Sequence, residues 1–391
     1  MKALLIGNFG AGNYGDEMIL IAFLERFLNE FPTATVGIVT ANEDLSRGFL
    51  GEFFNEKDLS RVSFVRPLPF GVRSLLRHVR SGSSLRKSYA EFDLAIYCGG
   101  GLFTDEESPL SVPMWASYGL LYKRWKRPVY AFGLGCGPIR RGLSRQIMTH
   151  LVPYFSYCGV RDEASLECAQ GFGGGEKVHL TRDSVFLLDG EKLRSKVDHL
   201  TPPVSGEYIA VTMRPWKTMT DAVCKKIAHT FERIIAQTGL RLFLVPFQEF
   251  PQNDKQILNK ISAHILKNEH IFVSDWQPSL MSLLGVLSHA KMALGMRLHS
   301  GYLSAVLGAS FVIIPYADKG RGAASFGDSS CIPLNRFLKL GQQPNDLTNF
   351  LKSVEDAHEL QVRKAADFNH IATVEFGKLA SAISRRMHIR E

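Results

Sequence analysis

The sequence predicts an α/β protein built from two Rossmann-like domains, each formed around a parallel sheet, with a cleft between the domains. The chain has 391 residues, more than one ordinary hydrophobic core holds. Short apolar runs alternate with stretches of helical periodicity in both halves, as expected of buried parallel strands joined by helices. The polar segment 192–207, with Pro202, Pro203 and Gly206, interrupts this alternation and is predicted to be a linker.

The first half is predicted to form a domain of residues 1–195. Its first strand is expected at residues 3–7. Residues 16–31 are predicted to be a helix, because their apolar side chains recur at helical spacing. Further strands are expected at residues 35–40, 94–98, 129–132, 157–160 and 178–180.

The second half is predicted to form a domain of residues 205–365. A helix opened by Pro278 is expected in it, and residues 366–391 are predicted to be a C-terminal helix that packs back onto the first domain. The strands are expected at residues 208–213, 240–247, 271–274, 292–295 and 311–315, and the other helices at 219–237, 254–267 and 298–307.

The composition is typical of a globular protein of the cytosol. Hydrophobic residues make up 45% of the chain and charged residues 21%. No run approaches the ~20 apolar residues that span a bilayer, and the N-terminus lacks the features of a signal peptide. We therefore expect a cytoplasmic protein, with the inner face of the membrane as a location to test. The six cysteines are expected to be reduced thiols, most of them buried.

An excess of cationic side chains indicates an anionic partner. The chain has 46 Lys and Arg against 38 Asp and Glu, a formal charge of +8. Basic residues concentrate at 73–87 and 123–127, without the aromatic residues of a nucleic-acid surface. Two interpretations stay open, a solvated basic surface and a peripheral membrane contact that meets lipid-linked or phosphorylated substrates. Nucleic acid is not expected as a partner.

A glycine-rich loop follows the first predicted strand. Gly10, Gly12 and Gly15 match the spacing of a dinucleotide-binding loop between a strand and a helix. Asp16 and Glu17 follow at once, and these carboxylates would repel a pyrophosphate. Three alternatives stay open: a loop at which substrate approaches the backbone near Gly12, Asn13 and Gly15, with Asp16 as base; a plain tight turn; and dinucleotide binding.

Other strand ends of the first half carry candidate substrate contacts. Gly100 and Gly101 belong to a run of three glycines, which permits close approach of a ligand. Thr104 with Glu107 resembles a capping box that would start a helix. Asp105 then either compensates the helix dipole or contacts substrate. Arg161 is either a substrate contact or half of an ion pair at a helix start.

The second half supplies the candidate anion site. Arg214 follows the first predicted strand of this half, and Arg297 and His299 join a later strand to a helix. A guanidinium beside helix N–H groups is well suited to bind an anion. The alternatives are a bidentate pair of Arg297 with a carboxylate and a polar surface role for His299. Tyr316 and Lys319 follow the next strand end, and Lys319 adds positive charge there.

Taken together, these segments resemble the polysaccharide pyruvyl transferase family. The resemblance rests on the order of GNYGDE, CGGGLFTD, GLGCGPI, VRDEAS, MRPW and GMRLH along most of the chain. It implies a GT-B-like fold and transfer of pyruvate from phosphoenolpyruvate to a pair of hydroxyls of a sugar in a polysaccharide or its precursor, giving a cyclic ketal. The chain departs from the family in a glycine run of three where many relatives have four, and in the sequence around Lys319.

The resemblance implies roles for the site residues. Arg214 and Arg297 would hold the carboxylate and phosphate of phosphoenolpyruvate, the donor substrate, which would bind in the second domain. His299 would protonate the donor and Asp16 would be the base on a glycan acceptor, free or lipid-linked, bound by the first domain. No metal and no cofactor are expected. A GT-B glycosyltransferase using a nucleotide sugar and a non-catalytic glycan-binding relative are the alternatives.

Overall fold

The computed structural model describes residues 1–69, 87–250, 253–266, 268–277, 279–316, 318–343 and 345–388. It divides into two compact units. Unit 1 contains Met1–Gly10, Asp16–Leu187 and His370–Glu391, and unit 2 contains Ala11–Gly15 and Leu188–Asn369. The two units are not continuous in sequence, since the short segment Ala11–Gly15 groups with unit 2. Most of the basic segment 73–87 lies outside the described residues.

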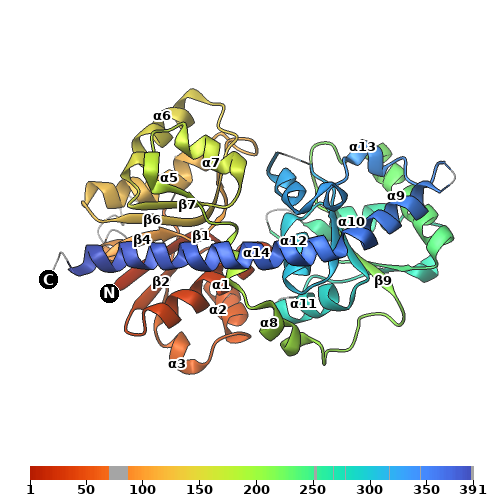
Figure 1. Cartoon of the computed structure of the whole chain (residues 1–391), viewed down its shortest axis with the longest axis horizontal. Helices are drawn as coiled ribbons and strands as arrows, with labels where there is room; N and C mark the ends of the chain where they lie inside the picture. Colours follow the sequence, from red (N-terminus) through yellow and green to blue (C-terminus); the bar gives the residue numbers. More distant parts are fainter. Residues whose placement is uncertain are drawn as a thin grey trace. The chain divides into compact units, whose positions relative to one another are not determined.

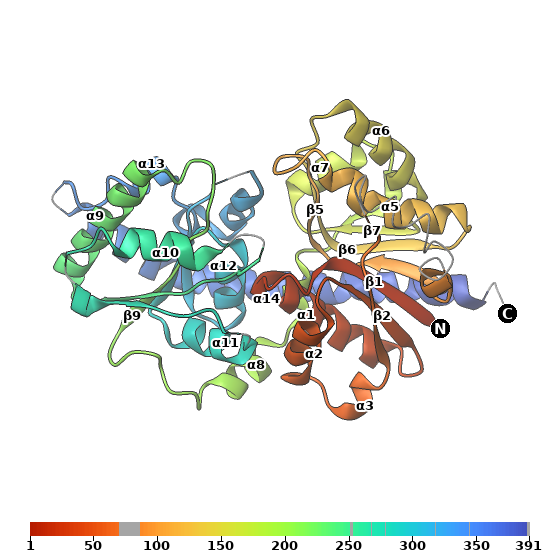
Figure 2. The ribbon, with the colours of Figure 1, turned by 180° about the vertical axis from the view of Figure 1, so that it is seen from behind.

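The sheet of unit 1 has eight strands, all parallel, in the order β3-β2-β1-β4-β6-β7-β8, with β5 paired to β6 (Figure 2). Strands β2 and β3 lie on one side of β1 and β4 lies on the other, so the sheet has a topological switch point between β1 and β4. Ligands of such sheets bind at the switch point, beyond the carboxyl ends of the strands. The strands are β1 (Lys2–Phe9), β2 (Thr35–Thr40), β3 (Val62–Val65), β4 (Leu94–Tyr97), β5 (Gly100–Phe103), β6 (Val129–Cys136), β7 (Tyr157–Val160) and β8 (Val178–Leu180).

Helices cover both faces of this sheet. On one face, Phe23 of the first helix, Phe132 of β6 and Phe376 of the last helix meet with ring centroids 5.5–6.0 Å apart. The opposite face packs against α5, α6 and α7 through buried apolar residues. The helices of unit 1 are α1 (Tyr14–Glu30, of which Tyr14 and Gly15 belong to unit 2), α2 (Glu43–Gly51), α3 (Glu56–Leu59), α5 (Ser111–Arg124), α6 (Gly142–Leu151) and α7 (Glu163–Gln170).

The sheet of unit 2 has five parallel strands in the order β11-β10-β9-β12-β13. Its switch point lies between β9 and β12. Gly295 at the end of β12 permits a close approach there, because a Cβ at this position would lie 2.0 Å from the carbonyl oxygen of Thr212. The strands are β9 (Tyr208–Thr212), β10 (Arg241–Leu244), β11 (Ile271–Val273), β12 (Met292–Gly295) and β13 (Ser310–Ile313).

The helices of unit 2 alternate with these strands. The last of them, α14, is one continuous helix (Figure 1) whose first part groups with unit 2 and whose residues from His370 group with unit 1. It begins twenty residues before the predicted 366. The helices are α8 (Gly190–Val197), α9 (Asp221–Thr238), α10 (Asp254–Ser262), α11 (Leu280–His289), α12 (Leu298–Val306), α13 (Leu334–Phe337) and α14 (Asp346–His388).

The predicted fold class is confirmed in its two Rossmann-like domains with parallel sheets, and three local predictions were wrong. The linker predicted from residue 192 begins as helix α8, which Asp189 caps by accepting the N–H of Lys192. The strand predicted to reach residue 247 ends at Leu244, shortly before Pro246, which has no N–H to donate to a sheet. Thr104 does not start a helix, because α5 begins only at Ser111. The hydroxyl of Thr104 donates instead to the carbonyl of Pro138.

Candidate functional site

The two arginines predicted to bind an anion come from adjacent strand ends of unit 2. Arg214 follows β9 and Arg297 follows β12, and Thr212 pairs with Gly295 in the register of these two strands. Both side chains are buried, with 5% and 6% of their surface exposed. The site therefore lies at the switch point of the unit 2 sheet, where ligands of this fold bind.

Arg214 is held between two aromatic rings. Its guanidinium carbon lies 4.4 Å from the ring centroid of Tyr316 and 5.2 Å from that of Trp216. One of its Nη atoms also donates to the hydroxyl of Tyr316. These contacts orient the Arg214 guanidinium at the end of β9.

Arg297 is paired with a carboxylate, the alternative left open by the sequence. Two of its guanidinium nitrogens donate to the two carboxylate oxygens of Asp254, with an Nε–Oδ2 distance of 2.9 Å, and its Nη1 donates to Gln248 Oε1 at 2.8 Å. Asp254 is fully buried and also accepts the backbone N–H groups of Phe247 and Gln248. Burial raises the pKa of Asp254, and the Arg297 guanidinium opposes that rise. Asp254 therefore fixes the position of Arg297 and compensates most of its charge.

His299 stands in the first turn of α12, two residues after Arg297, and is half-buried. Its ring lies edge-on to Tyr302, with centroids 6.0 Å apart. Gly15 packs directly against it, because a Cβ at position 15 would lie 2.4 Å from His299 Nδ1. The glycine loop near the N-terminus and the predicted catalytic histidine are thus in contact within unit 2.

The same loop is tied to the network around Arg297. Asn13 forms an antiparallel bridge with Gln248, and the carbonyl of Gly12 accepts the N–H of Glu249 at 3.3 Å. Tyr14 donates its N–H to the carbonyl of Phe247, and its ring stacks on Trp276 with centroids 5.7 Å apart. Gln248 therefore connects the loop of residues 11–15 to Arg297.

The glycine contact leads to a prediction for Gly15→Ala. The added methyl group should displace the His299 imidazole by about an ångström, and misplacement on that scale lowers turnover by about 100-fold. The melting temperature should fall as well, because His299 Cβ would lie only 2.8 Å from the added methyl group and cannot move without the backbone of α12. Gly48→Ala on α2 is the matched control, because nothing lies within 4 Å of a Cβ there. Equal turnover of the two variants would show that the imidazole position is not critical.

The remaining predicted residues, apart from Lys319, lie in unit 1. The carboxylate of Asp16 accepts Asn8 Nδ2 at 2.9 Å, and its Oδ1 lies 3.4 Å from where a Cβ of Gly100 would be. Gly100 and Gly101 form the start of β5. Gly100 has a φ of +81°, as the triple glycine led us to expect.

Two other predicted contacts of unit 1 have structural partners. Asp105 accepts the backbone N–H groups of Arg140 and Arg141 at 2.8–3.1 Å. Burial alone would raise the pKa of Asp105, but these donors outweigh it and the pKa is lowered. Arg161 is buried against Asp162 at 3.1 Å and Asp183 at 3.7 Å, the ion pair considered as its alternative. The side chain of Lys319 lies outside the described residues.

Glu17 is a buried acid beside the loop of residues 11–15. Its environment could not be predicted from the sequence. Its Oε1 accepts the N–H of Gly10 at 2.7 Å, and it is 1% exposed. Among the described residues, no hydrogen-bond partner is found for its Oε2. Burial raises the pKa of Glu17 from its ordinary 4.5 to about 8, the Gly10 N–H opposing this rise. The side chain is therefore mainly neutral at pH 7.

This pKa predicts how stability depends on pH. Between pH 4.5 and 8 the folded protein keeps a proton on Glu17 that the unfolded chain releases. The contribution of Glu17 to the free energy of unfolding should thus fall by about 1.4 kcal/mol per pH unit across this window. Glu17→Gln, which keeps a neutral acceptor for Gly10, should remove that dependence. Urea unfolding of both proteins from pH 5 to 8 measures it, and parallel curves would contradict the prediction.

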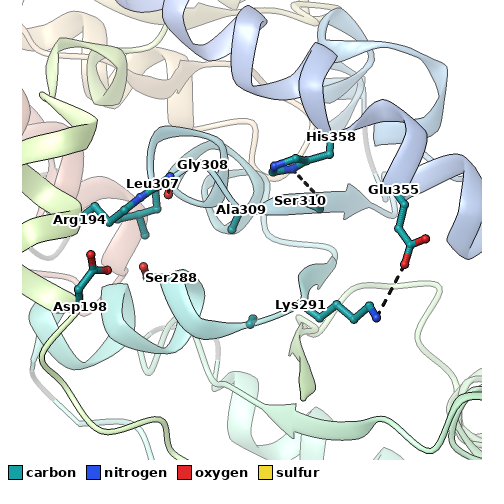
Figure 3. A pocket seen from close by; sticks show the side chains of 11 residues that line it. Arg194, Asp198, Ser288, Lys291, Leu307, Gly308, Ala309, Ser310, Glu355 and His358 are labelled. Carbon is teal, nitrogen blue, oxygen red and sulfur yellow. Dashed lines mark hydrogen bonds and ion pairs between the residues drawn. The ribbon is translucent and has the colours of Figure 1, made fainter. Parts of the chain in front are cut away.

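Two pockets of unit 2 lie on opposite edges of its sheet. One, of about 310 Å³, is at the carboxyl ends of β10 and β11 and includes Tyr14 in its lining. The other, of about 420 Å³, is at the amino ends of β12 and β13 (Figure 3). In this second pocket Lys291 pairs with Glu355 at 3.8 Å, and Ser310 lies 3.0 Å from His358. We assign the candidate active site to the carboxyl edge because Arg214, Arg297 and His299 lie there.

Neither a membrane-spanning helix nor a metal site is found where the structure is described. No helix among these residues has the length and apolar character needed to cross a bilayer. Within the same residues, no three His, Cys, Asp or Glu side chains are grouped so that they could hold a metal ion.

Solved structures confirm the fold. The chain is similar to a putative UDP-N-acetylglucosamine 2-epimerase of Listeria monocytogenes, with a TM-score of 0.65 and 12% identity over 98% of this chain and 97% of that one. It is also similar to HepE of Anabaena in complex with UDP and glucose, with a TM-score of 0.58 and 13% identity over 97% of this chain and all of that one. At such identities the likeness shows the fold alone.

Sequence comparisons identify the family. The amylovoran biosynthesis protein AmsJ of Erwinia amylovora is 23% identical over 363 residues, which cover 82% of this chain and 85% of that protein. The family model of polysaccharide pyruvyl transferases matches residues 13–318. This match includes both arginines, His299 and most of the glycine loop that contacts it. The chain belongs to the polysaccharide pyruvyl transferase family, and it is an enzyme of that kind.

Proposed function

We propose that this enzyme transfers pyruvate from phosphoenolpyruvate to two hydroxyls of a sugar in a polysaccharide or its precursor, forming a pyruvate ketal. The observation that carries the proposal is the placement of Arg214, Arg297 and His299 at the ends of β9 and β12 and the start of α12. Phosphoenolpyruvate carries two anionic groups next to a carbon that must be protonated. A guanidinium and an imidazole at one site match these two requirements.

The two arginines have different roles in this proposal. Arg214 receives an anionic group of the donor, because Tyr316 and Trp216 hold its guanidinium at the end of β9. Three of the five N–H donors of Arg297 form hydrogen bonds to Asp254 and Gln248. Its main role in the proposal is therefore to hold the start of α12, with its backbone N–H groups, in place. The hydroxyl of Tyr316 orients Arg214.

The chemistry needs one proton at carbon. His299 as imidazolium gives its proton to the methylene carbon of phosphoenolpyruvate, which becomes a methyl group, and C2 becomes electron-poor. A sugar hydroxyl attacks C2 and loses its proton to a base, for which Asp16, oriented by Asn8, is our candidate. Phosphate leaves from C2 with its bonding electrons, and a second hydroxyl of the same sugar adds there, gives its proton to the departing phosphate and closes the ketal. Positive charge from Arg214 stabilises the departing phosphate.

The experiment is a phosphate-release assay with phosphoenolpyruvate and a library of short glycans. Wild-type protein should release phosphate only when a suitable glycan is present. Arg214→Ala should raise the KM for phosphoenolpyruvate, while Lys225→Ala, which removes an exposed cation of α9, should leave it unchanged. Stabilisation by nucleotide sugars, combined with no phosphate release from any glycan mixture, would overturn the proposal in favour of glycosyl transfer.

A further inference from the structure

Two cysteines meet at the carboxyl edge of the unit 1 sheet. Cys136 is the last residue of β6, and Cys168 lies in α7. The sulfur atoms are 3.5 Å apart, with the thiol of Cys136 donating to Cys168. The two thiols thus touch, although 31 residues separate them in the chain.

The environments of these two sulfurs differ. Cys136 is buried, whereas Cys168 is half-buried and so can be reached by a small reagent. The hydrogen bond from Cys136 lowers the pKa of Cys168, and Arg145 lowers it further. The same contact together with burial raises the pKa of Cys136. Cys168 is therefore the thiol that ionises first and reacts first.

The backbone around the pair already holds the two elements together. The N–H of Cys136 donates to the hydroxyl of Ser165 in α7 at 3.0 Å. Gly137, with a φ of +93°, leaves room for the sulfur of Cys168, because a Cβ at position 137 would lie 2.9 Å from it. The end of β6 and α7 are thus already in close contact where a bond between the two sulfurs would form.

We propose that Cys136 and Cys168 form an oxidative modification site, at which hydrogen peroxide or a related peroxide converts the two thiols into a disulfide. The Cys168 thiolate attacks one peroxide oxygen, breaks the O–O bond and becomes a sulfenic acid, with release of the first water. The Cys136 thiol then attacks that sulfur, forms the S–S bond and expels the second water. Two thiols lose two electrons, and the peroxide gains them.

The modification would act on the loops at the carboxyl edge of unit 1. Gly137 donates its N–H to the carbonyl of Phe103 at 2.7 Å, and Pro138 accepts the N–H of Asp105 at 3.3 Å. A disulfide would therefore link α7 covalently to the end of β6, and the next two residues, Gly137 and Pro138, are hydrogen-bonded to the segment that carries Asp105. This inference is independent of pyruvyl transfer, since its evidence is the thiol pair alone.

The experiment treats the reduced, folded protein with hydrogen peroxide and maps its peptides by mass without reduction. The expected result is a peptide that joins Cys136 to Cys168 and lacks two hydrogen atoms, and that dithiothreitol separates. In Cys136→Ser, and in Cys136→Ala as a second variant, Cys168 should instead be oxidised to its sulfinic acid. Cys331→Ser removes another half-buried cysteine and should leave the cross-link unchanged.

The result that would overturn the proposal is a wild-type protein that stays folded in peroxide without this cross-link. Oxidation of Cys168 to sulfinic acid at the same rate in wild type and in Cys136→Ser would also overturn it, because Cys136 would then not resolve the sulfenic acid.

Discussion

Replacing Asp254 with alanine is expected to lower the free energy of unfolding by about 3–5 kcal/mol, since it leaves the buried Arg297 charge without its partner. Turnover should fall with it, by at least about 100-fold, because Arg297 and the start of α12 lose their fixed position. Urea unfolding and phosphate release measure the two effects. Asp221→Ala, which breaks an exposed ion pair with Lys260, should leave both unchanged.

A double variant separates the stabilising role of this pair from its role in the reaction. Asp254→Leu with Arg297→Met replaces both charges by apolar groups, and such replacements of a buried pair are often neutral in stability. We expect the double variant to regain most of the lost stability but not the turnover. Recovery of turnover together with stability would show that Arg297 serves the fold alone.

Replacing His299 with alanine is expected to reduce kcat by about 100- to 10,000-fold, the usual contribution of a general acid. The KM for phosphoenolpyruvate should change much less, since in our proposal it is Arg214 that holds an anionic group of the donor. Steady-state phosphate release measures both constants. His264→Ala, which removes a half-buried histidine of unit 2 whose Nε2 lies 3.5 Å from the Asp221 carboxylate, is the matched histidine control. A His299→Ala enzyme with unchanged kcat would rule out this histidine as the acid.

The strand ends that carry the main site residues can be predicted from the sequence, because a buried strand is a short apolar run that local pattern identifies. Arg214, Arg297 and His299 follow apolar runs directly, and the parallel sheet brings such strand ends to one edge. The alternation of buried strands and helices likewise indicates both Rossmann-like domains.

The partners of these residues could not be predicted, since they are distant in the chain. Asp254 lies 43 residues before Arg297 and, in the sequence alone, looks like an ordinary acid at a helix start. The contact of Gly15 with His299 joins residues 284 positions apart. The raised pKa of Glu17 could not be predicted, because its largest cause is burial by the fold. Interactions that depend on tertiary packing leave no local pattern to read.

The most direct test of the account is the mass and isotope content of the glycan product formed from phosphoenolpyruvate in deuterium oxide. We predict a glycan that gains the mass of pyruvic acid less one water, with one deuterium in the methyl group, as protonation at the methylene carbon requires. The His299→Ala enzyme should form this product only at its residual rate. A glycan that gains phosphate or a glycosyl unit, or a pyruvylated product whose methyl group carries no deuterium, would contradict the account.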